Sequence, residues 1–294
     1  MVLLTRPEGS QPEDFHLSRR GVAAVFFAGY AAAAFSAEAD PIHTDEVGLI
    51  TETVMLPSPD RQIPGYLARP AAPGRYPAVV VLSEIFGVHE YIKDVCRRFA
   101  KLGYVAVAPA FFIRAGDPAP LTDYPAIMKI VAQASDPQVM GDIGATLKFL
   151  KAQRYVDRSR FAVTGFCWGG GETWLACEKF PEFKAGVAWY GRLAPAPDAA
   201  PDPKKYWPIQ LAADLKCPVL GLYAGKDSLT KAVPAMREAL KAAGKTGSEI
   251  VIYDDAQHGF HADYRPSYNA ADAENGWARL QSHFQRNGVG PGRA

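Results

Sequence analysis

The chain has 294 residues, of which 48% are hydrophobic and 21% charged, with 32 Lys and Arg against 31 Asp and Glu. This is an ordinary globular composition, and a net charge of +1 excludes a global electrostatic attraction to nucleic acid or to an anionic membrane surface. No internal repeat or low-complexity linker divides the sequence, so we expect a single domain over residues 40–294.

Residues 1–39 have the pattern of an export leader. Arg19 and Arg20 precede a run that carries no charged residue before Glu38, and Ala37–Ala39 is typical of a signal-peptidase site. The run is shorter than the ~20 apolar residues that a membrane-spanning helix needs. The paired arginines resemble a twin-arginine signal, which predicts export to the periplasm and no stable membrane insertion after cleavage. The alternative is an uncleaved apolar helix on a cytoplasmic protein.

Two kinds of strand signal follow along the chain. Residues 48–71 look like two strands joined by a Pro-Asp turn, which predicts antiparallel strands at the N-terminal edge of the sheet. Continuous apolar runs then predict strands that are buried on both faces of a parallel sheet. These runs occupy residues 79–82, 104–112, 160–166, 185–191, 217–225 and 248–255.

Helical periodicity fills the intervals between these strands. Apolar residues recur three or four positions apart in four sets: Ile92, Val95, Phe99 and Leu102; Met140, Ile143, Leu147 and Leu150; Val233, Met236 and Leu240; Trp277, Leu280 and Phe284. Strands that alternate with helices predict an α/β fold, with a mostly parallel central sheet and helices on both faces. Ligands of such a fold bind at the carboxyl ends of the strands.

One strand leads directly into a glycine-rich turn, GFCWGG at residues 165–170, with Cys167 at its apex. Small neighbours permit a sharp strand–turn–helix connection, as in the nucleophile elbow G-x-S-x-G, here written with cysteine. The free amide groups at the start of the helix favour a thiolate. The alternative interpretation is a buried cysteine in an ordinary turn between a strand and a helix.

The other cysteines give no such signal. Cys96 and Cys217 lie in apolar contexts, Cys177 lies ten residues after Cys167 on the same expected helix, and no C-x-x-C pair suggests a zinc or redox site. We therefore expect all three to be buried as small hydrophobic residues.

A nucleophile elbow requires an acid and then a histidine further along the chain. Asp227 follows one predicted strand, in the sequence AGKD, and His258 follows the next. His258 could accept the thiol proton of Cys167 while Asp227 holds the other ring nitrogen.

Nearby residues leave alternatives open at this stage. Asp254 or Asp255 could supply the acid, and His261 could supply the base. His258 and His261 are three residues apart and could form a metal pair, although no third ligand stands out.

The sequence resembles the dienelactone hydrolases, also called carboxymethylenebutenolidases, over residues 48–287. The resemblance rests on the segments SEIFGVHEYIKDVCRRFAKLGYVAVAPAFF, GFCWGG, AGKD and HGFHADYR. It implies an α/β-hydrolase fold, a triad of Cys167, Asp227 and His258, and no metal or organic cofactor.

The resemblance also implies roles for residues around the nucleophile. Glu84 corresponds to a carboxylate that holds the resting thiol neutral and accepts its proton when substrate arrives. The backbone N–H groups of Ile85 and Trp168 would form the oxyanion hole, in which each donor contributes roughly 10²–10³ to the rate.

In the prototype members two arginines hold the substrate carboxylate. Arg114 matches the first, but Ala262 stands where the second is expected, with His261 and Arg265 as neighbours that could substitute. This departure puts dienelactone itself in doubt as the substrate, so discrimination between acidic and neutral substrates should be weaker than with two arginines, with a moderate preference for the acidic form.

The sequence thus predicts a monomeric hydrolase that opens a small lactone or activated ester through a cysteine thioester. A general carboxylesterase or thioesterase is an alternative within the same chemistry. A non-catalytic ligand-binding protein of this fold is the alternative from another class.

Overall fold

The computed structural model describes residues 41–196 and 200–291. The predicted leader, residues 1–39, lies outside the described residues, so its cleavage and export through it stay predictions. In the described part of the chain, no helix combines the length and the apolar character needed to cross a membrane.

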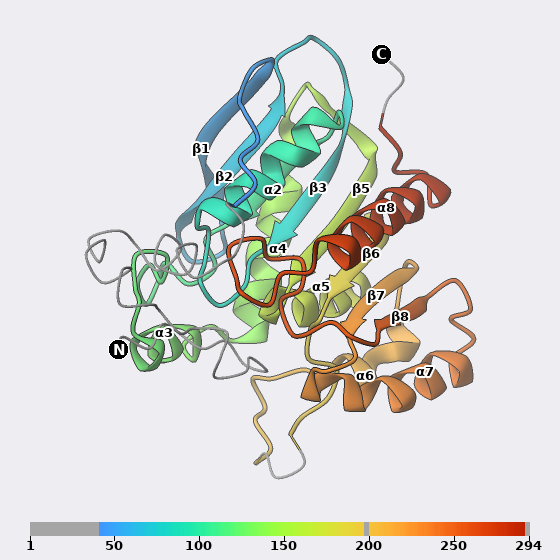
Figure 1. Cartoon of the computed structure of the whole chain (residues 1–294). Coiled ribbons are helices and arrows are strands. Elements are labelled where there is room, and N and C mark those ends of the chain that lie inside the picture. Colours follow the sequence, from blue (N-terminus) through green and yellow to red (C-terminus); the bar gives the residue numbers. More distant parts are fainter. Residues whose placement is uncertain (1–40, 197–199, 292–294) are drawn as a thin grey trace.

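The described strands form one eight-stranded sheet in the order β1-β2-β4-β3-β5-β6-β7-β8 (Figure 1). β2 is antiparallel to β1 and to β4, and every neighbouring pair from β4 to β8 is parallel. This confirms the predicted sheet and its antiparallel N-terminal edge. The strands are β1 (Leu49–Pro57), β2 (Gln62–Pro70), β3 (Tyr76–Leu82), β4 (Val105–Pro109), β5 (Val156–Phe166), β6 (Phe183–Trp189), β7 (Val219–Ala224) and β8 (Glu249–Tyr253).

Burial along the strands follows from their place in the sheet. Every residue of β4 and β7 is buried, whereas the edge strand β1 has only two buried residues among nine. Helices cover both faces of the inner strands, which is why their sequences are continuous apolar runs.

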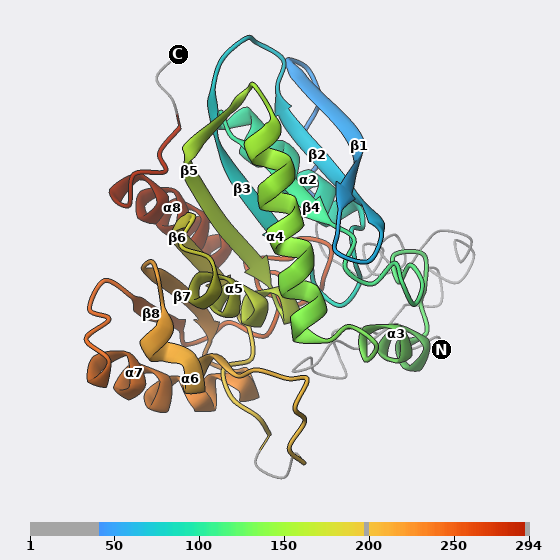
Figure 2. The same cartoon turned by 180° about the vertical axis from the view of Figure 1, so that it is seen from behind.

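Helices pack on both faces of the sheet. α2 and α8 lie on the face toward the viewer in Figure 1, and α4 and α5 lie on the face toward the viewer in Figure 2. The four predicted periodic segments correspond to α2, α4, α7 and α8, except that Leu102 caps α2 rather than extending it. The helices are α2 (Glu90–Lys101), α3 (Tyr124–Val131), α4 (Asp136–Ala152), α5 (Trp168–Lys179), α6 (Pro208–Leu211), α7 (Val233–Ala242) and α8 (Ala270–Arg286).

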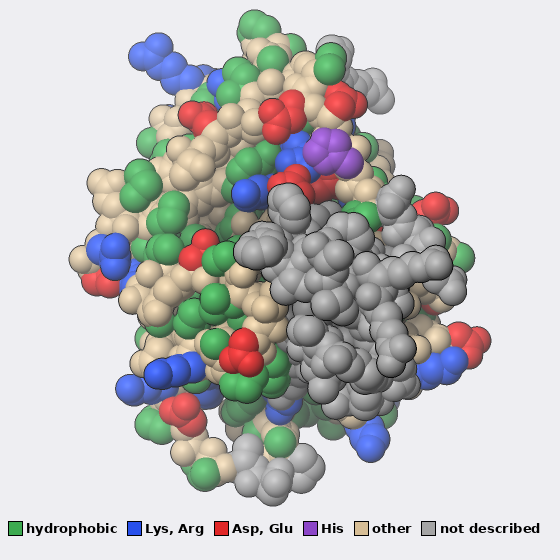
Figure 3. Space-filling view, turned by 60° about the vertical axis from the view of Figure 1, so that its left-hand side comes forward, with side chains coloured by type: hydrophobic (Ala, Val, Ile, Leu, Met, Phe, Trp, Pro, Cys, Tyr) green, Lys and Arg blue, Asp and Glu red, His purple; other side chains and the backbone are tan. Residues whose placement is uncertain are grey.

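Surface charge is dispersed on the part of the molecule that Figure 3 shows. Acidic and basic side chains alternate there with apolar and neutral ones over the described residues in view. This distribution agrees with the near-zero net charge of the sequence.

The carboxyl ends of the parallel strands point toward α3 (Figures 1 and 2). The turn after β5 and the loops after β3, β6, β7 and β8 therefore converge at one edge of the sheet. The candidate site lies at this edge, as the topology requires for an α/β protein.

Candidate active site

Cys167 forms the turn between β5 and α5. Its backbone has φ 54° and ψ −114°, and its side chain is 4% exposed. A positive φ is uncommon for a residue with a β-carbon and persists only where surrounding contacts enforce it. Here the Cys167 N–H donates to the carbonyl of Trp189 at 3.0 Å, which ties the turn to β6. The sharp strand–turn–helix predicted from GFCWGG is present.

Glycine is required on both sides of this turn. A β-carbon on Gly165 would lie 2.1 Å from the carbonyl oxygen of Gly169, and one on Gly169 would lie 2.4 Å from that of Leu82. The first turn of α5 thus sits directly against the end of β3. This contact brings the amide of Trp168 toward the segment that contains Ile85.

His258 and Asp227 form a buried hydrogen-bonded pair at the ends of β8 and β7. The Nδ1 atom of His258 lies 2.6 Å from Oδ2 of Asp227, and the two residues are 1% and 3% exposed. The other oxygen of Asp227 accepts a hydrogen bond from the N–H of Leu229 at 3.0 Å. Each carboxylate oxygen therefore has its own donor, which fixes the orientation of the imidazole.

Cys167 contributes, together with Asp227, to the raised pKa of His258. Burial disfavours the imidazolium form of His258, but the charge and hydrogen bonding of Cys167 and Asp227 outweigh it and raise its pKa to about 10. The buried Nε2 atom of His258 makes no hydrogen bond of normal geometry to a described residue. The pair of Cys167 and His258 therefore does not have the geometry of a normal hydrogen bond, as is common for catalytic pairs without bound substrate.

The alternative acids and base lie elsewhere. Asp254 and Asp255 are exposed, and Asp255 forms an ion pair with Lys226 at 3.3 Å. His261 is buried with its Nδ1 atom 2.7 Å from the hydroxyl of Tyr91. Burial and the nearby Arg98 hold the pKa of His261 well below its ordinary value.

His258 and His261 thus contact different partners, which does not favour the alternative of a metal pair. Among the described residues, no group of three or more potential metal ligands occurs.

Glu84 follows β3 and is completely buried. Its Oε2 atom accepts a hydrogen bond from the Tyr264 hydroxyl at 2.7 Å, while His89 and Arg265 each approach the carboxylate to 3.6 Å. Burial would raise the pKa of Glu84, but these three partners outweigh it and lower the pKa. Arg265, a predicted substrate ligand, is therefore a neighbour of Glu84.

A tyrosine that the sequence reasoning missed, Tyr190, packs against the imidazole of His258 with the ring centroids 5.1 Å apart. Tyr190 follows β6 with φ 39° and is fully buried. Burial raises its pKa well above the ordinary value, and the charges of Glu84 and Cys167 raise it further. A tyrosine directly after an apolar strand was the available sequence signal.

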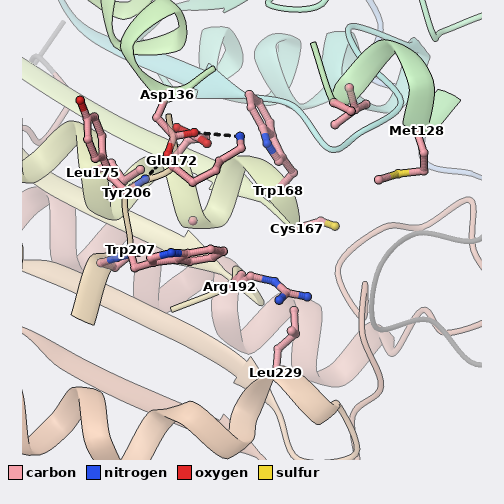
Figure 4. A pocket seen from close by; sticks show the side chains of 15 residues that line it. Met128, Asp136, Cys167, Trp168, Glu172, Leu175, Arg192, Tyr206, Trp207 and Leu229 are labelled. Atoms are coloured by element: carbon pink, nitrogen blue, oxygen red, sulfur yellow. Dashed lines mark hydrogen bonds and ion pairs between the residues drawn. The ribbon is translucent and has the colours of Figure 1, made fainter. Parts of the chain in front are cut away.

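A pocket of about 250 Å³ opens beside Cys167 (Figure 4). Its size is slightly below the usual range of small-molecule sites, which favours a compact substrate. Arg192 and Leu229 lie near Cys167, and Asp136, Glu172 and Tyr206 gather at the opposite end. The indole rings of Trp168 and Trp207 lie between these two groups, and sequence reasoning identified only Cys167 and Trp168 among the lining residues.

The predicted substrate ligands Arg114, His261 and Arg265 do not line this pocket. Arg114 instead donates to both carboxylate oxygens of Asp142 at 2.8 Å, and it also contacts Asp60 and Ser58. These ion pairs connect the loop after β4 to α4 and to the turn between β1 and β2. The sequence reasoning could not predict these ion pairs, because their residues are far apart in the chain and no local sequence pattern marks them.

Replacing Arg114 by alanine is expected to lower the free energy of unfolding by about 3 kcal/mol, because the fully buried Asp142 loses its countercharge. KM should change equally for acidic and neutral esters, since Arg114 does not line the pocket. Urea unfolding and paired kinetics measure the two effects. Arg160→Ala, which removes a more exposed ion pair with Asp157, is the control. A loss of affinity confined to acidic esters would instead assign Arg114 to substrate binding.

The sheet order, the single antiparallel strand and the sharp turn after β5 define an α/β-hydrolase fold. The sequence profile of the dienelactone hydrolase family matches residues 63–288, and the chain belongs to this family. A protein of Methylorubrum extorquens named "Putative carboxymethylenebutenolidase" is 49% identical, over 93% of this chain and 94% of its own length. A protein of Escherichia coli with the same name is 42% identical, over 88% of this chain and 96% of its own length.

A crystal structure from Klebsiella pneumoniae, titled as a "Putative Dienelactone Hydrolase", superposes with a TM-score of 0.76. It is 42% identical and covers 81% of this chain and 99% of its own. The family and the fold together identify the protein as a carboxylic ester hydrolase of the dienelactone hydrolase type.

Proposed function

We propose that the protein hydrolyses a lactone or activated ester through a thioester on Cys167, with His258 as the base and Asp227 as the acid that orients it. The observation that supports this proposal is the 2.6 Å bond between His258 and Asp227 behind a strained elbow whose cysteine lines a pocket. The acidic side chain fixes the ring and stabilises the imidazolium form.

In the first step the sulfur of Cys167 attacks the substrate carbonyl carbon, and the thiol proton passes to Nε2 of His258. The bond between the carbonyl carbon and the leaving oxygen then breaks, and the imidazolium gives its proton to that oxygen. In a lactone the leaving oxygen stays attached to the acyl chain. The pocket therefore has to hold the whole opened chain.

The negative oxygen of the tetrahedral intermediate would be held by the backbone amides of Ile85 and Trp168. Trp168 is the first residue of α5, so its N–H has no partner within the helix. In the part of the chain that the structure describes, neither amide donates to another residue. Both donors are thus available for the intermediate.

In the second step water attacks the thioester. His258 accepts a proton from the water, the C–S bond breaks, and the sulfur of Cys167 leaves with that proton. We propose Glu84 as the alternative to His258 for accepting the single thiol proton of Cys167 when substrate arrives. The carboxylate is ionised, because its three partners lower its pKa.

Purified protein is expected to hydrolyse a neutral aryl acetate and an enol lactone, and iodoacetamide should abolish both activities as it alkylates Cys167. All four cysteines are buried, but Cys167 lines the pocket beside Trp168, and burial raises the pKa of Cys96 and of Cys177, so the other cysteines should react more slowly. Peptide mass mapping beside residual activity measures this. Full activity after complete alkylation of Cys167 would reject the nucleophile. Binding of both compounds without turnover would favour a ligand-binding protein.

A further inference from the structure

The end of the pocket opposite Cys167 contains a carboxyl group that the proposed mechanism does not use. Glu172 lies on α5, five residues after Cys167, and lines the same pocket (Figure 4). Five residues of helix correspond to an axial rise of roughly 7 Å. The backbone positions of Cys167 and Glu172 are therefore separated along α5 by about the length of a short acyl chain.

Glu172 is 5% exposed, and its buried Oε2 atom has no hydrogen-bond partner among the described residues. Its neighbour Asp136 is fully engaged, because one oxygen accepts from Lys205 at 2.9 Å and the other accepts from the Tyr206 N–H. A buried polar group without a partner is costly to maintain, which makes it a good candidate for a group that substrate satisfies.

The surroundings of Glu172 keep it neutral near pH 7. Burial and the negative charge of Asp136 raise its pKa to about 8, although Lys205 acts in the opposite direction. A neutral carboxyl group donates one hydrogen bond and rejects anions less than a carboxylate does. The pocket is also lined by other ionisable side chains. These are Asp136 of α4, Lys205 and Tyr206 before α6, Arg192 after β6, and Cys167 of the elbow.

We propose that Glu172 forms a specificity subsite that donates a hydrogen bond to an uncharged oxygen on the acyl chain of the substrate. Such an oxygen can belong to an ether, a ketone or a hydroxyl group, four to six bonds beyond the reacting carbonyl. The subsite rests on the proposed function, since Cys167 defines where the acyl chain begins. Trp168 and Trp207 would flank the chain between its two ends.

Matched probes test the subsite. The aryl esters of 4-methoxybutanoate and hexanoate have equal chain length and differ by one oxygen in place of a methylene. The protein is expected to favour the ether ester in kcat/KM by roughly fivefold, mainly through KM, as one hydrogen bond allows. Glu172→Leu should remove this preference, and Glu172→Gln, which still has an N–H donor, should keep most of it.

Glu178 is the matched control on the same helix. It is also 5% exposed and its pKa is raised to about 9 by burial and Asp214, but it does not line the pocket. Glu178→Gln should leave the preference unchanged. An equal loss of preference in the variants at both positions would overturn the subsite.

The dependence on pH gives a second readout if Glu172→Leu fails to fold. Above about pH 8 the wild-type carboxyl group ionises and loses its donor, so the ether preference should vanish there but persist in Glu172→Gln. The aryl ester of 5-aminopentanoate, of similar length, tests for a cation site. A clear preference for it at neutral pH would overturn the neutral subsite.

Binding separates failure of the subsite from failure of the proposed function. Calorimetry with the unreactive amides of 4-methoxybutanoic acid and hexanoic acid measures binding without turnover. The amide that contains the ether oxygen should have a roughly fivefold lower Kd, whether or not the protein hydrolyses esters. Absence of ester turnover together with this affinity ratio would reject the thioester chemistry alone. Equal Kd values in the presence of normal turnover would reject the subsite alone.

Discussion

Asp227→Asn is expected to lower kcat/KM for a neutral aryl acetate by roughly 10²–10⁴ while leaving the fold intact. Asp227 accepts the Nδ1–H of His258 at 2.6 Å and is one of the two groups that raise the histidine pKa. An asparagine amide can present N–H to that nitrogen and select the wrong tautomer, and it cannot stabilise the imidazolium form. The loss should therefore lie mainly in kcat.

The controls are Asp254→Asn and Asp255→Asn, which change the two carboxylates considered as alternative acids. Both are exposed, and neither contacts His258 in the structure. Each should retain activity close to that of the unmodified protein in the same assay. An equal loss at Asp254 or Asp255, or normal kcat in Asp227→Asn, would reject the assignment of the acid.

Local patterns were sufficient to predict most of the fold. Continuous apolar runs located β3 to β8, a Pro-Asp turn located β1 and β2, and helical periodicity located α2, α4, α7 and α8, because inner strands and amphipathic helices bury recurring faces. Helix α3 was missed because it is short, although its start carries a recognisable signal. Asp123 caps it by accepting from the N–H of Ala126 at 2.9 Å, and Pro125 occupies its first turn.

Only part of the candidate site could be predicted from sequence. Cys167, Asp227 and His258 each follow a strand, so topology alone brings them to one edge of the sheet. Arg192 also follows a strand, but its sequence has no motif that separates it from any surface arginine. Glu172 lies in a helix whose residues are mostly buried, and its unpaired oxygen is visible only in the folded structure.

Cys167→Ala is expected to produce the largest loss, roughly 10³–10⁶ in kcat/KM, because it removes the atom that forms the proposed covalent intermediate. The thermal midpoint should change little, since alanine keeps the β-carbon and the strained backbone of the turn. Cys177→Ala, which changes a buried cysteine on α5 away from the pocket, is the control and should retain activity despite some loss of stability. Retention of more than a tenth of the activity in Cys167→Ala would contradict the proposed role.

Mass spectrometry of the enzyme quenched in acid during turnover of an aryl ester tests the thioester most directly. Wild-type protein should carry one acyl group, mapped to the peptide that contains Cys167 and released by neutral hydroxylamine, and Cys167→Ala should carry none. Slowing deacylation with Asp227→Asn should make the adduct easier to detect if acylation is less impaired. Two results would contradict the account. One is an acyl group mapped to a residue other than Cys167 in the wild-type protein. The other is an acyl adduct that still forms in Cys167→Ala.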